Sequence, residues 1–223
     1  MLGLPTPLPY PQLCPMYAEA IARLLLETGA VILRPQAPFT WASGWRSPIY
    51  CDNRLVLSYP AARKQVADAL ADALKTAYPT AGAVAGVATA GIPQGALVAE
   101  RLALPFLYVR SAAKQHGRGN QVEGRIVPGQ PVAVIEDLVS TGGSSLAACQ
   151  ALATEGAQVA GMLCVFTYGF AQATEAFDQA GVPFSSLSDY DALLRVAQAQ
   201  GMFSADDLAS LAAWRQSPAT WGI

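Results

Sequence analysis

A short segment in the second half of the chain places two carboxylates directly before a run of small residues. The apolar residues 132–135 are followed by Glu136 and Asp137, and the small residues of 140–144 then lead into a segment of helical character. Backbone N–H groups and hydroxyls in such a loop, at the amino end of a helix, form a cradle for a phosphate. Two carboxylates cannot bind that same phosphate, so they must serve neutral or cationic groups next to it.

Sugar hydroxyls and a magnesium ion meet that requirement. The segment therefore predicts a ribose 5-phosphate site, with the phosphate in the loop and the 2- and 3-hydroxyls on the acids. The alternative is that the acids only cap a helix and the glycines only make a turn. The order of strand, acid pair, loop and helix favours the binding site. The chain contains neither G-x-x-x-x-G-K-[ST] nor G-x-G-x-x-G, the competing phosphate motifs.

The elements around this segment alternate between amphipathic helices and apolar strands. We expect helices at 17–27, 60–77, 93–102, 144–155, 171–180, 189–199 and 204–215, and strands at 30–33, 83–88, 105–110, 132–135, 158–167 and 184–187. Two short strands around a Ser-Gly turn are expected within 39–54, and a long polar loop at 111–124. Repeated strand–helix–strand units with nearly continuous apolar strands predict an α/β fold, a parallel twisted sheet flanked by helices. Ligands of such sheets bind beyond the carboxyl ends of the strands, where the acid pair and its loop lie.

Length and composition predict one domain over residues 1–223. Residues 1–15 contain five prolines and are expected to form an irregular arm. The stretch 76–99 carries no charged residue, but its prolines and glycines make it a poor membrane helix. A net charge of −2 argues against nucleic acid or a membrane surface as partner. We therefore expect a cytoplasmic protein.

The cysteines and the histidine exclude several kinds of site. The four cysteines, at 14, 51, 149 and 164, include no C-x-x-C pair, so we expect reduced thiols and no residues dedicated to a metal. His116 is the single histidine, which rules out any site that needs two.

The polar loop also carries an unusual concentration of positive charge. From Arg110 to Arg125 it holds four of the fourteen Lys and Arg residues and one acid, Glu123. A solvated surface loop is the alternative interpretation. Because glycines flank its central basic residues, the loop predicts a mobile lid that closes over an anionic ligand.

Three separated motifs resemble the type I phosphoribosyltransferase family. Residues 132–145 (VAVIEDLVSTGGSS) resemble its motif for 5-phosphoribosyl 1-diphosphate (PRPP). Residues 108–124 (YVRSAAKQHGRGNQVEG) resemble the mobile catalytic loop of its orotate-specific members. The run 39–54 (FTWASGWRSPIYCDNR) and residues 187–190 (LSDY) are similar to the same members.

The resemblance implies transfer of ribose 5-phosphate from PRPP to orotate in UMP biosynthesis, with Mg²⁺ as cofactor and diphosphate as second product. It implies a homodimer with active sites shared between subunits, and a small hood formed by about 16–58 and the C-terminal segment. The catalytic residues it implies are Lys114, His116, Glu136 and Asp137. The PRPP-binding residues it implies are Arg110, Lys114, His116, Glu136, Asp137, Leu138, Val139, Ser140, Thr141, Gly142, Gly143 and Ser144. Ser140 is also the implied contact to orotate.

The chain departs from the family's better-known form at a few positions. Ala42 and Ala90 stand where many members have lysine, and an arginine is replaced near Tyr168. Arg46, Arg54 and Tyr168 are therefore the candidates for binding the orotate carboxylate and the diphosphate.

Two alternative functions remain at this point. One is a purine-type phosphoribosyltransferase, against which the run 39–54 argues. The other is a non-catalytic PRPP sensor that binds RNA. The confinement of excess positive charge to one loop argues against that regulator.

Overall fold

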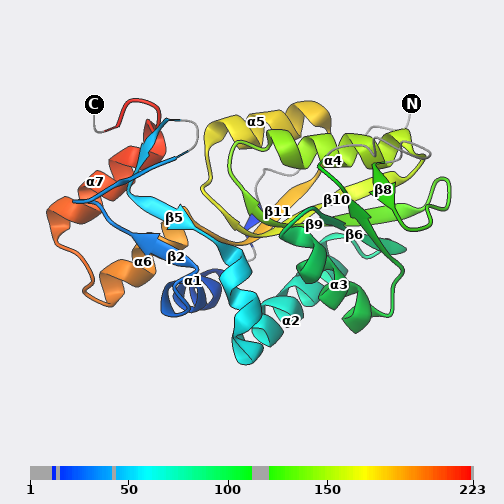
Figure 1. Cartoon of the computed structure of the whole chain (residues 1–223), viewed down its shortest axis with the longest axis horizontal. Helices are drawn as coiled ribbons and strands as arrows, with labels where there is room; N and C mark the ends of the chain where they lie inside the picture. Colours follow the sequence, from blue (N-terminus) through cyan, green and yellow to red (C-terminus); the bar gives the residue numbers. More distant parts are fainter. Residues whose placement is uncertain (1–11, 14–15, 42–43, 112–120, 222–223) are drawn as a thin grey trace, which may run out of the picture.

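A seven-stranded sheet forms the centre of the molecule (Figure 1). The structure is a computed structural model that describes residues 12–13, 16–41, 44–111 and 121–221. Within these residues the strands of the sheet are ordered β1 (Gln12–Leu13), β11 (Phe184–Asp189), β10 (Gln158–Thr167), β9 (Pro131–Val139), β6 (Ala83–Val87), β7 (Phe106–Val109) and β8 (Val122–Glu123). Neighbours are parallel except for β7 and β8, so the predicted α/β class is confirmed.

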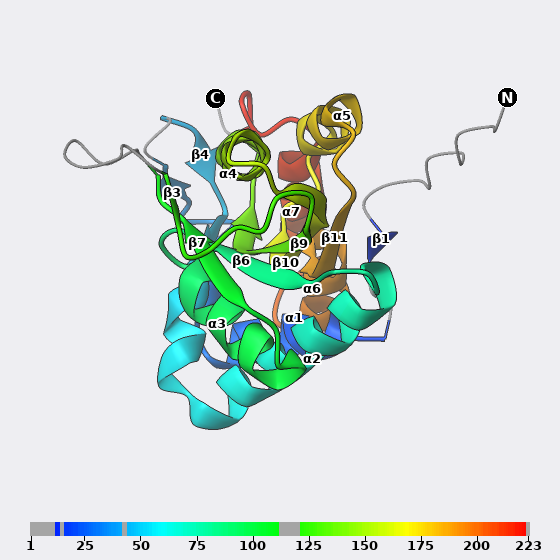
Figure 2. The same ribbon diagram turned by 90° about the vertical axis from the view of Figure 1, so that its right-hand side faces the viewer.

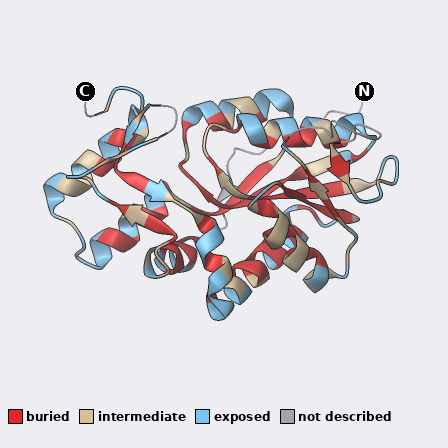
Figure 3. Ribbon diagram, in the orientation of Figure 1, coloured by how far each residue is buried: buried red, intermediate tan, exposed pale blue. Residues whose placement is uncertain are grey.

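Helices cover both faces of this sheet, because successive side chains of its central strands alternate between two cores. In β9, Val132 and Val134 pack in one core with α4 (Gly143–Thr154) and α5 (Ala171–Ala180). Ala133 and Ile135 pack in the other core with α1 (Ala18–Glu27), α2 (Pro60–Ala77) and α3 (Gly91–Leu102). Figure 2 shows the two layers on opposite sides of the sheet, and Figure 3 shows the sheet as the most continuously buried part.

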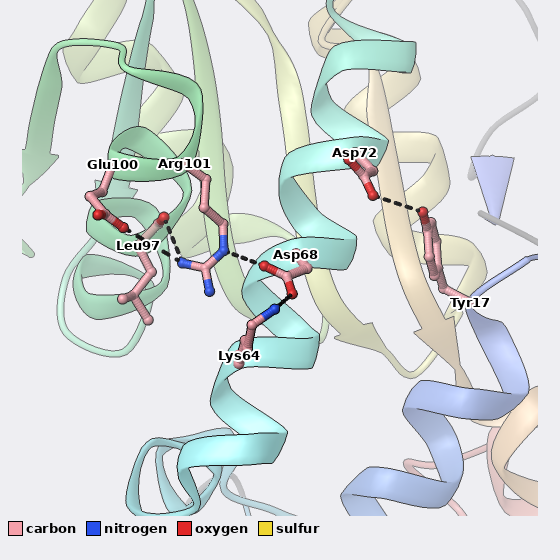
Figure 4. Close-up of polar contacts among 7 residues, drawn as sticks. All are labelled: Tyr17, Lys64, Asp68, Asp72, Leu97, Glu100 and Arg101. Carbon is pink, nitrogen blue, oxygen red and sulfur yellow. Dashed lines mark hydrogen bonds and ion pairs between the residues drawn. The ribbon is translucent and has the colours of Figure 1, made fainter.

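The helix α2 presents an apolar face to the core and a charged face to its neighbours. Val66, Leu70 and Leu74 are buried at the predicted spacing of four. On its polar face, Asp68 accepts from Arg101 of α3 at 2.5 Å and from Lys64 at 2.6 Å (Figure 4). The Lys64–Asp68 pair is exposed and adds little stability, so the apolar face accounts for most of the packing of α2.

The same close-up shows how α1 joins this layer. Tyr17 Oη donates to Asp72 Oδ2 at 3.5 Å, and Arg101 Nη1 also donates to the main-chain oxygen of Leu97 at 3.1 Å (Figure 4).

A group of smaller elements, which we call the hood, lies beside one end of the sheet (Figure 1). It contains two small antiparallel pairs, β2 (Val31–Leu33) with β5 (Ile49–Cys51) and β3 (Phe39–Thr40) with β4 (Arg46–Ser47). The helices α6 (Tyr190–Ala199) and α7 (Ala205–Gln216) complete it. Trp214 of α7 is fully buried and its indole N–H donates to the main-chain oxygen of Arg46 at 3.2 Å, which fixes β4 against the C-terminal helices.

Several predicted boundaries are wrong. The strand predicted at 132–135 extends to Val139, because β10 continues to pair with it as far as Thr167 opposite Val139. The strand predicted at 184–187 reaches Asp189 for the same reason, since Thr167 also pairs with that residue. The helix predicted at 93–102 begins at Gly91, because proline is tolerated in a first turn whose N–H groups have no helical acceptor.

Two segments predicted as irregular contain short strands. Val122–Glu123 of the predicted polar loop forms β8 against β7, while 112–120 lie outside the described residues. Gln12–Leu13 of the predicted irregular arm forms β1 along β11, and the rest of 1–11 and 14–15 also lies outside them. Cys51, Cys149 and Cys164 carry reduced thiols, as predicted, and Cys14 is not among the described positions. Across the described ranges no helix has the length and apolar character needed to span a membrane.

Candidate active site

Two adjoining cavities open at the carboxyl ends of β9 and β10. The first, the aromatic cavity, has a volume of about 420 Å³ and is lined by Phe39, Thr40, Trp41, Tyr50, Cys51, Leu138, Ser140 and Tyr168. The second, the acidic cavity, has a volume of about 380 Å³ and is lined by Cys51, Asp52, Arg54, Ala88, Thr89, Ala90, Glu136, Asp137, Leu138 and Ser144. Cys51 and Leu138 line both, so ligands in the two cavities lie next to each other.

The aromatic cavity offers flat apolar walls and a few polar atoms. The ring centroids of Phe39 and Tyr50 lie 5.5 Å apart, and those of Trp41 and Tyr168 lie 5.2 Å apart. Burial raises the pKa of Tyr168 well above its ordinary value, so its phenol stays neutral. Such walls, with the hydroxyl of Ser140 among them, suit a planar heterocyclic ring.

Neighbouring elements hold these walls in place. The indole N–H of Trp41 donates to the main-chain oxygen of Ile49 at 3.2 Å, which ties this ring to β5. Tyr168 directly follows β10, and the hydroxyl of Thr167 donates to the main-chain oxygen of Val139 at 2.9 Å. Ser140 and Tyr168 therefore follow the ends of two paired strands and enter the same cavity.

The buried Glu136 and the half-buried Asp137 both line the acidic cavity. Glu136 is only 6% exposed; its carboxylate accepts from the main-chain N–H of Asp137 at 3.0 Å and from the Ser145 hydroxyl at 3.4 Å. Burial raises the pKa of Glu136, and the adjacent Asp137 charge adds to this rise. Burial also raises the pKa of Asp137. A pair whose negative charge is disfavoured in this way favours cations and hydroxyl donors as ligands.

A glycine lets the opposite wall approach the acids. A Cβ atom at Gly91 would lie 2.6 Å from the main-chain oxygen of Ile135 and 3.3 Å from Glu136 Oε1. Only glycine allows α3 to begin this close to β9. The preceding residues, Thr89 and Ala90, consequently form part of the cavity wall.

The three candidates for anion binding are placed differently. Arg54 lines the acidic cavity, where Asp52 holds its guanidinium through two hydrogen bonds of 2.6 and 2.8 Å; this pairing also lowers the pKa of Asp52. Tyr168 lines the aromatic cavity. Arg46 is exposed and is not among the residues that line either cavity.

The loop 140–144 connects the two cavities to the amino end of α4. Ser140 lines the aromatic cavity and Ser144 the acidic one. Gly142 caps α4 with φ of +86°, a conformation that favours glycine, and its Cβ position would lie 3.2 Å from a ring carbon of Phe177. A side chain at 142 would therefore point toward α5. The first-turn N–H groups of α4 have no acceptor within the helix and are available to an anion.

Several other predicted residues within the described part of the chain do not line either cavity. Val139 is fully buried in the core with α4 and α5, and Thr141 and Gly143 are not among the lining residues. Arg110 follows β7, and its guanidinium lies 3.9 Å from Glu123 Oε1. Lys114 and His116 lie outside the described residues.

Residues of the hood that the sequence did not single out also contribute to the site. Cys51 and Asp52 line the acidic cavity. The run 39–54 pointed to this part of the site as a segment, but its motif gave no role to either position.

Comparison with known proteins shows which family of proteins the chain resembles. The sequence pattern of the family described as Phosphoribosyl transferase domain matches residues 55–186, more than half of the chain. The match includes β9, the acid pair and the loop that leads into α4.

Individual relatives narrow the class. An orotate phosphoribosyltransferase of Bacillus caldolyticus is 54% identical over 202 residues, 91% of this chain and 98% of that protein. One of Cytophaga hutchinsonii is 50% identical over 205 residues, 92% and 98% of the two chains. The crystal structure of orotate phosphoribosyltransferase from Aeropyrum pernix superposes with a TM-score of 0.71 at 32% identity, covering 82% of this chain and 99% of that one. The chain therefore belongs to the orotate phosphoribosyltransferases.

Proposed function

We propose that this chain transfers ribose 5-phosphate from PRPP to orotate and forms orotidine 5′-monophosphate and diphosphate, a step of UMP biosynthesis in the cytoplasm. The observation that carries this proposal is the contact between the two cavities, which share Cys51 and Leu138. A ring nitrogen can attack the anomeric carbon of a ribose only when ring and sugar lie side by side. The aromatic cavity fits the ring and the acidic cavity fits the sugar.

In this proposal the acid pair binds the ribose. The hydroxyls of the sugar donate to Glu136 and Asp137, and the 5-phosphate lies in the loop 140–144 at the amino end of α4. Bond cleavage at the anomeric carbon builds positive charge on the ribose, which a fixed carboxylate nearby stabilises. The aromatic walls orient the orotate ring and exclude water, with the Ser140 hydroxyl as a polar contact.

The diphosphate that leaves needs positive charge. Arg54 supplies it from the wall of the acidic cavity, where Asp52 fixes the guanidinium. We propose that Arg110 and, from the part of the chain that is not described, Lys114 and His116 act on the same group. In this proposal the chain is a homodimer, and the segment that carries Lys114 completes the site of the neighbouring subunit.

Mg²⁺ is the proposed cofactor, and when bound it would neutralise charge on the diphosphate. Over the described part of the chain no group of three or more His, Cys, Asp or Glu side chains could hold a metal ion. Two carboxylates and the oxygens of the substrate itself fit the preference of Mg²⁺ for few protein ligands together with phosphates. We therefore expect the ion to bind together with PRPP, where the acid pair and the substrate oxygens would hold it.

A comparison of bases tests this function against its alternatives. Purified chain is mixed with PRPP, Mg²⁺ and either orotate, adenine, hypoxanthine or uracil, and nucleotide formation is followed by chromatography. Of the four bases, we expect only orotate to yield a nucleotide. A purine nucleotide as the main product would favour the purine-type enzyme, whereas tight RNA binding without turnover would favour the regulator.

A further inference from the structure

A buried asparagine connects the hood to the strand that carries the acids. Asn53, the first residue of the 3₁₀ helix η1 (Asn53–Ser58), is only 1% exposed. Its amide N–H donates to the main-chain oxygen of Asp137 at 2.7 Å, across 84 positions of sequence. Its amide oxygen accepts from the thiol of Cys51 at 3.4 Å. Because burial and nearby carboxylates raise the pKa of that thiol, Cys51 keeps the proton that it donates.

Both partners of Asn53 belong to the cavities. Cys51 lines the aromatic and the acidic cavity, and Asp137 lines the acidic one. The asparagine itself lines neither, so it acts on ligands only through its two neighbours.

The bond lies where the sheet no longer holds β9 on both sides. The ladder between β6 and β9 ends at Gly86 opposite Ile135, while the ladder with β10 continues to Val139. The end of β9 that carries the acids is therefore bound by a strand on one side only. The side-chain amide of Asn53 donates to a main-chain oxygen of this end, that of Asp137, and so connects this part of β9 to the hood.

We propose that Asn53 is a positioning residue for the transfer reaction, because its amide fixes the main chain of Asp137 relative to the wall that both cavities share. This inference rests on the proposed function. A side chain that acts next to the anomeric carbon loses much of its effect on the reaction rate when it is displaced by as little as about 1 Å. The bond is thus expected to matter more for the chemical step than for substrate binding.

Two substitutions at this position separate positioning from packing. Asn53→Asp keeps the shape of the side chain and the acceptor for Cys51, and once its carboxyl is ionised it has no hydrogen to donate to Asp137. Because burial favours the protonated carboxyl, this variant is assayed over a range of pH, and its loss of kcat should grow as the pH rises. Asn53→Ala removes both bonds and leaves a small gap. If Asn53 only fills space, the aspartate variant should retain the wild-type kcat.

The chain offers a matched control at the opposite end of the same sheet. Gln130, just before β9, donates from its amide to the main-chain oxygen of Gly82 at 2.8 Å. Gln130→Glu therefore makes the same chemical change far from the two cavities. It replaces an amide that donates to a main-chain oxygen with a carboxyl group.

The experiment compares kcat and KM for orotate and PRPP in the wild-type chain and the three variants. All are measured at one temperature at which circular dichroism shows every chain to be folded. We expect kcat of both Asn53 variants to fall about tenfold or more, equivalent to about 1.4 kcal/mol, with both KM values within about twofold of wild type. Gln130→Glu should lower the unfolding temperature and leave kcat unchanged.

Three results would overturn the inference. The first is a wild-type kcat in folded Asn53→Asp. The second is a loss confined to KM, and the third is an equal loss of kcat in Gln130→Glu. If Asn53→Asp does not fold, the kcat of Asn53→Ala decides. A wild-type chain that does not convert orotate would instead refute the proposed function itself, so the two failures are distinguishable.

Discussion

The Glu136→Gln substitution keeps the shape of a buried side chain and removes its titrating carboxyl. The amide oxygen of glutamine can still accept from the main-chain N–H of Asp137, and its NH₂ group can donate to the hydroxyl of Ser145. We therefore expect the variant to fold with the same contacts. Its stability should be higher than that of the wild-type chain, whereas its turnover should be lower because the ribose loses one acceptor.

The size of the gain follows from the pKa of Glu136. Burial, together with the charge of Asp137, raises this pKa from 4.5 to about 9. Above pH 4.5 the unfolded chain releases a proton that the folded chain keeps, so stability falls as pH rises through this window, by about 1.4 kcal/mol per unit. At pH 7 the loss amounts to about 3 kcal/mol. Glutamine does not titrate, so the variant escapes this loss.

Urea unfolding of both chains between pH 5 and pH 8 measures the effect. The stability advantage of Glu136→Gln should be small at pH 5 and should widen steadily toward pH 8. Glu155→Gln, at an exposed position after α4, controls for the loss of one negative charge. An advantage that is equal at pH 5 and pH 8, or a variant less stable than the wild-type chain at pH 8, would refute this account of the acid pair.

Three further predictions concern the cavities and the shared site. Gly91→Ala should destabilise the chain by about 1–3 kcal/mol and reduce turnover, because its Cβ would lie 2.6 Å from the oxygen of Ile135; calorimetry showing an unchanged unfolding temperature would contradict this. Ser140→Ala should raise KM for orotate several-fold and change that for PRPP little, and steady-state kinetics with equal increases would count against the assignment. In the proposed homodimer, Lys114→Ala and Asp137→Asn should each abolish turnover, whereas a mixture of the two variants that exchanges subunits should regain about one quarter of wild-type turnover. No recovery, with exchange confirmed by mass spectrometry, would rule out a shared site.

The acid pair and the loop were predictable because one contiguous segment encodes them. The apolar run before Glu136 indicates the strand, and the glycines after it indicate the turn into α4. The end of β9 was not predictable in the same way. The two carboxylates look like the end of the strand in the sequence, because charged residues interrupt the apolar run. The backbone nevertheless continues to pair with β10 as far as Val139, since backbone pairing does not depend on which side chains the strand carries.

The walls of the cavities depend on contacts between distant segments. Trp41 and Tyr168 meet across a cavity although one belongs to the hood and the other follows β10. The bond from Asn53 to Asp137 joins residues 84 positions apart. Periodicity and motifs report local structure, so neither contact leaves a signal in the sequence, and Arg46 and Arg54 could not be told apart before the fold was known.

The chemistry assigned to the two adjoining cavities is tested most directly by identifying the products of one reaction. Orotate, PRPP and Mg²⁺ are incubated with the purified chain, and the mixture is analysed by chromatography and by an assay for diphosphate. We predict orotidine 5′-monophosphate and diphosphate in equal amounts, with neither formed by Asp137→Asn and both formed at the wild-type rate by Gln130→Glu. Unchanged orotate in the presence of the folded wild-type chain, or diphosphate released without the nucleotide, would contradict the assignment of orotate to the aromatic cavity and PRPP to the acidic one.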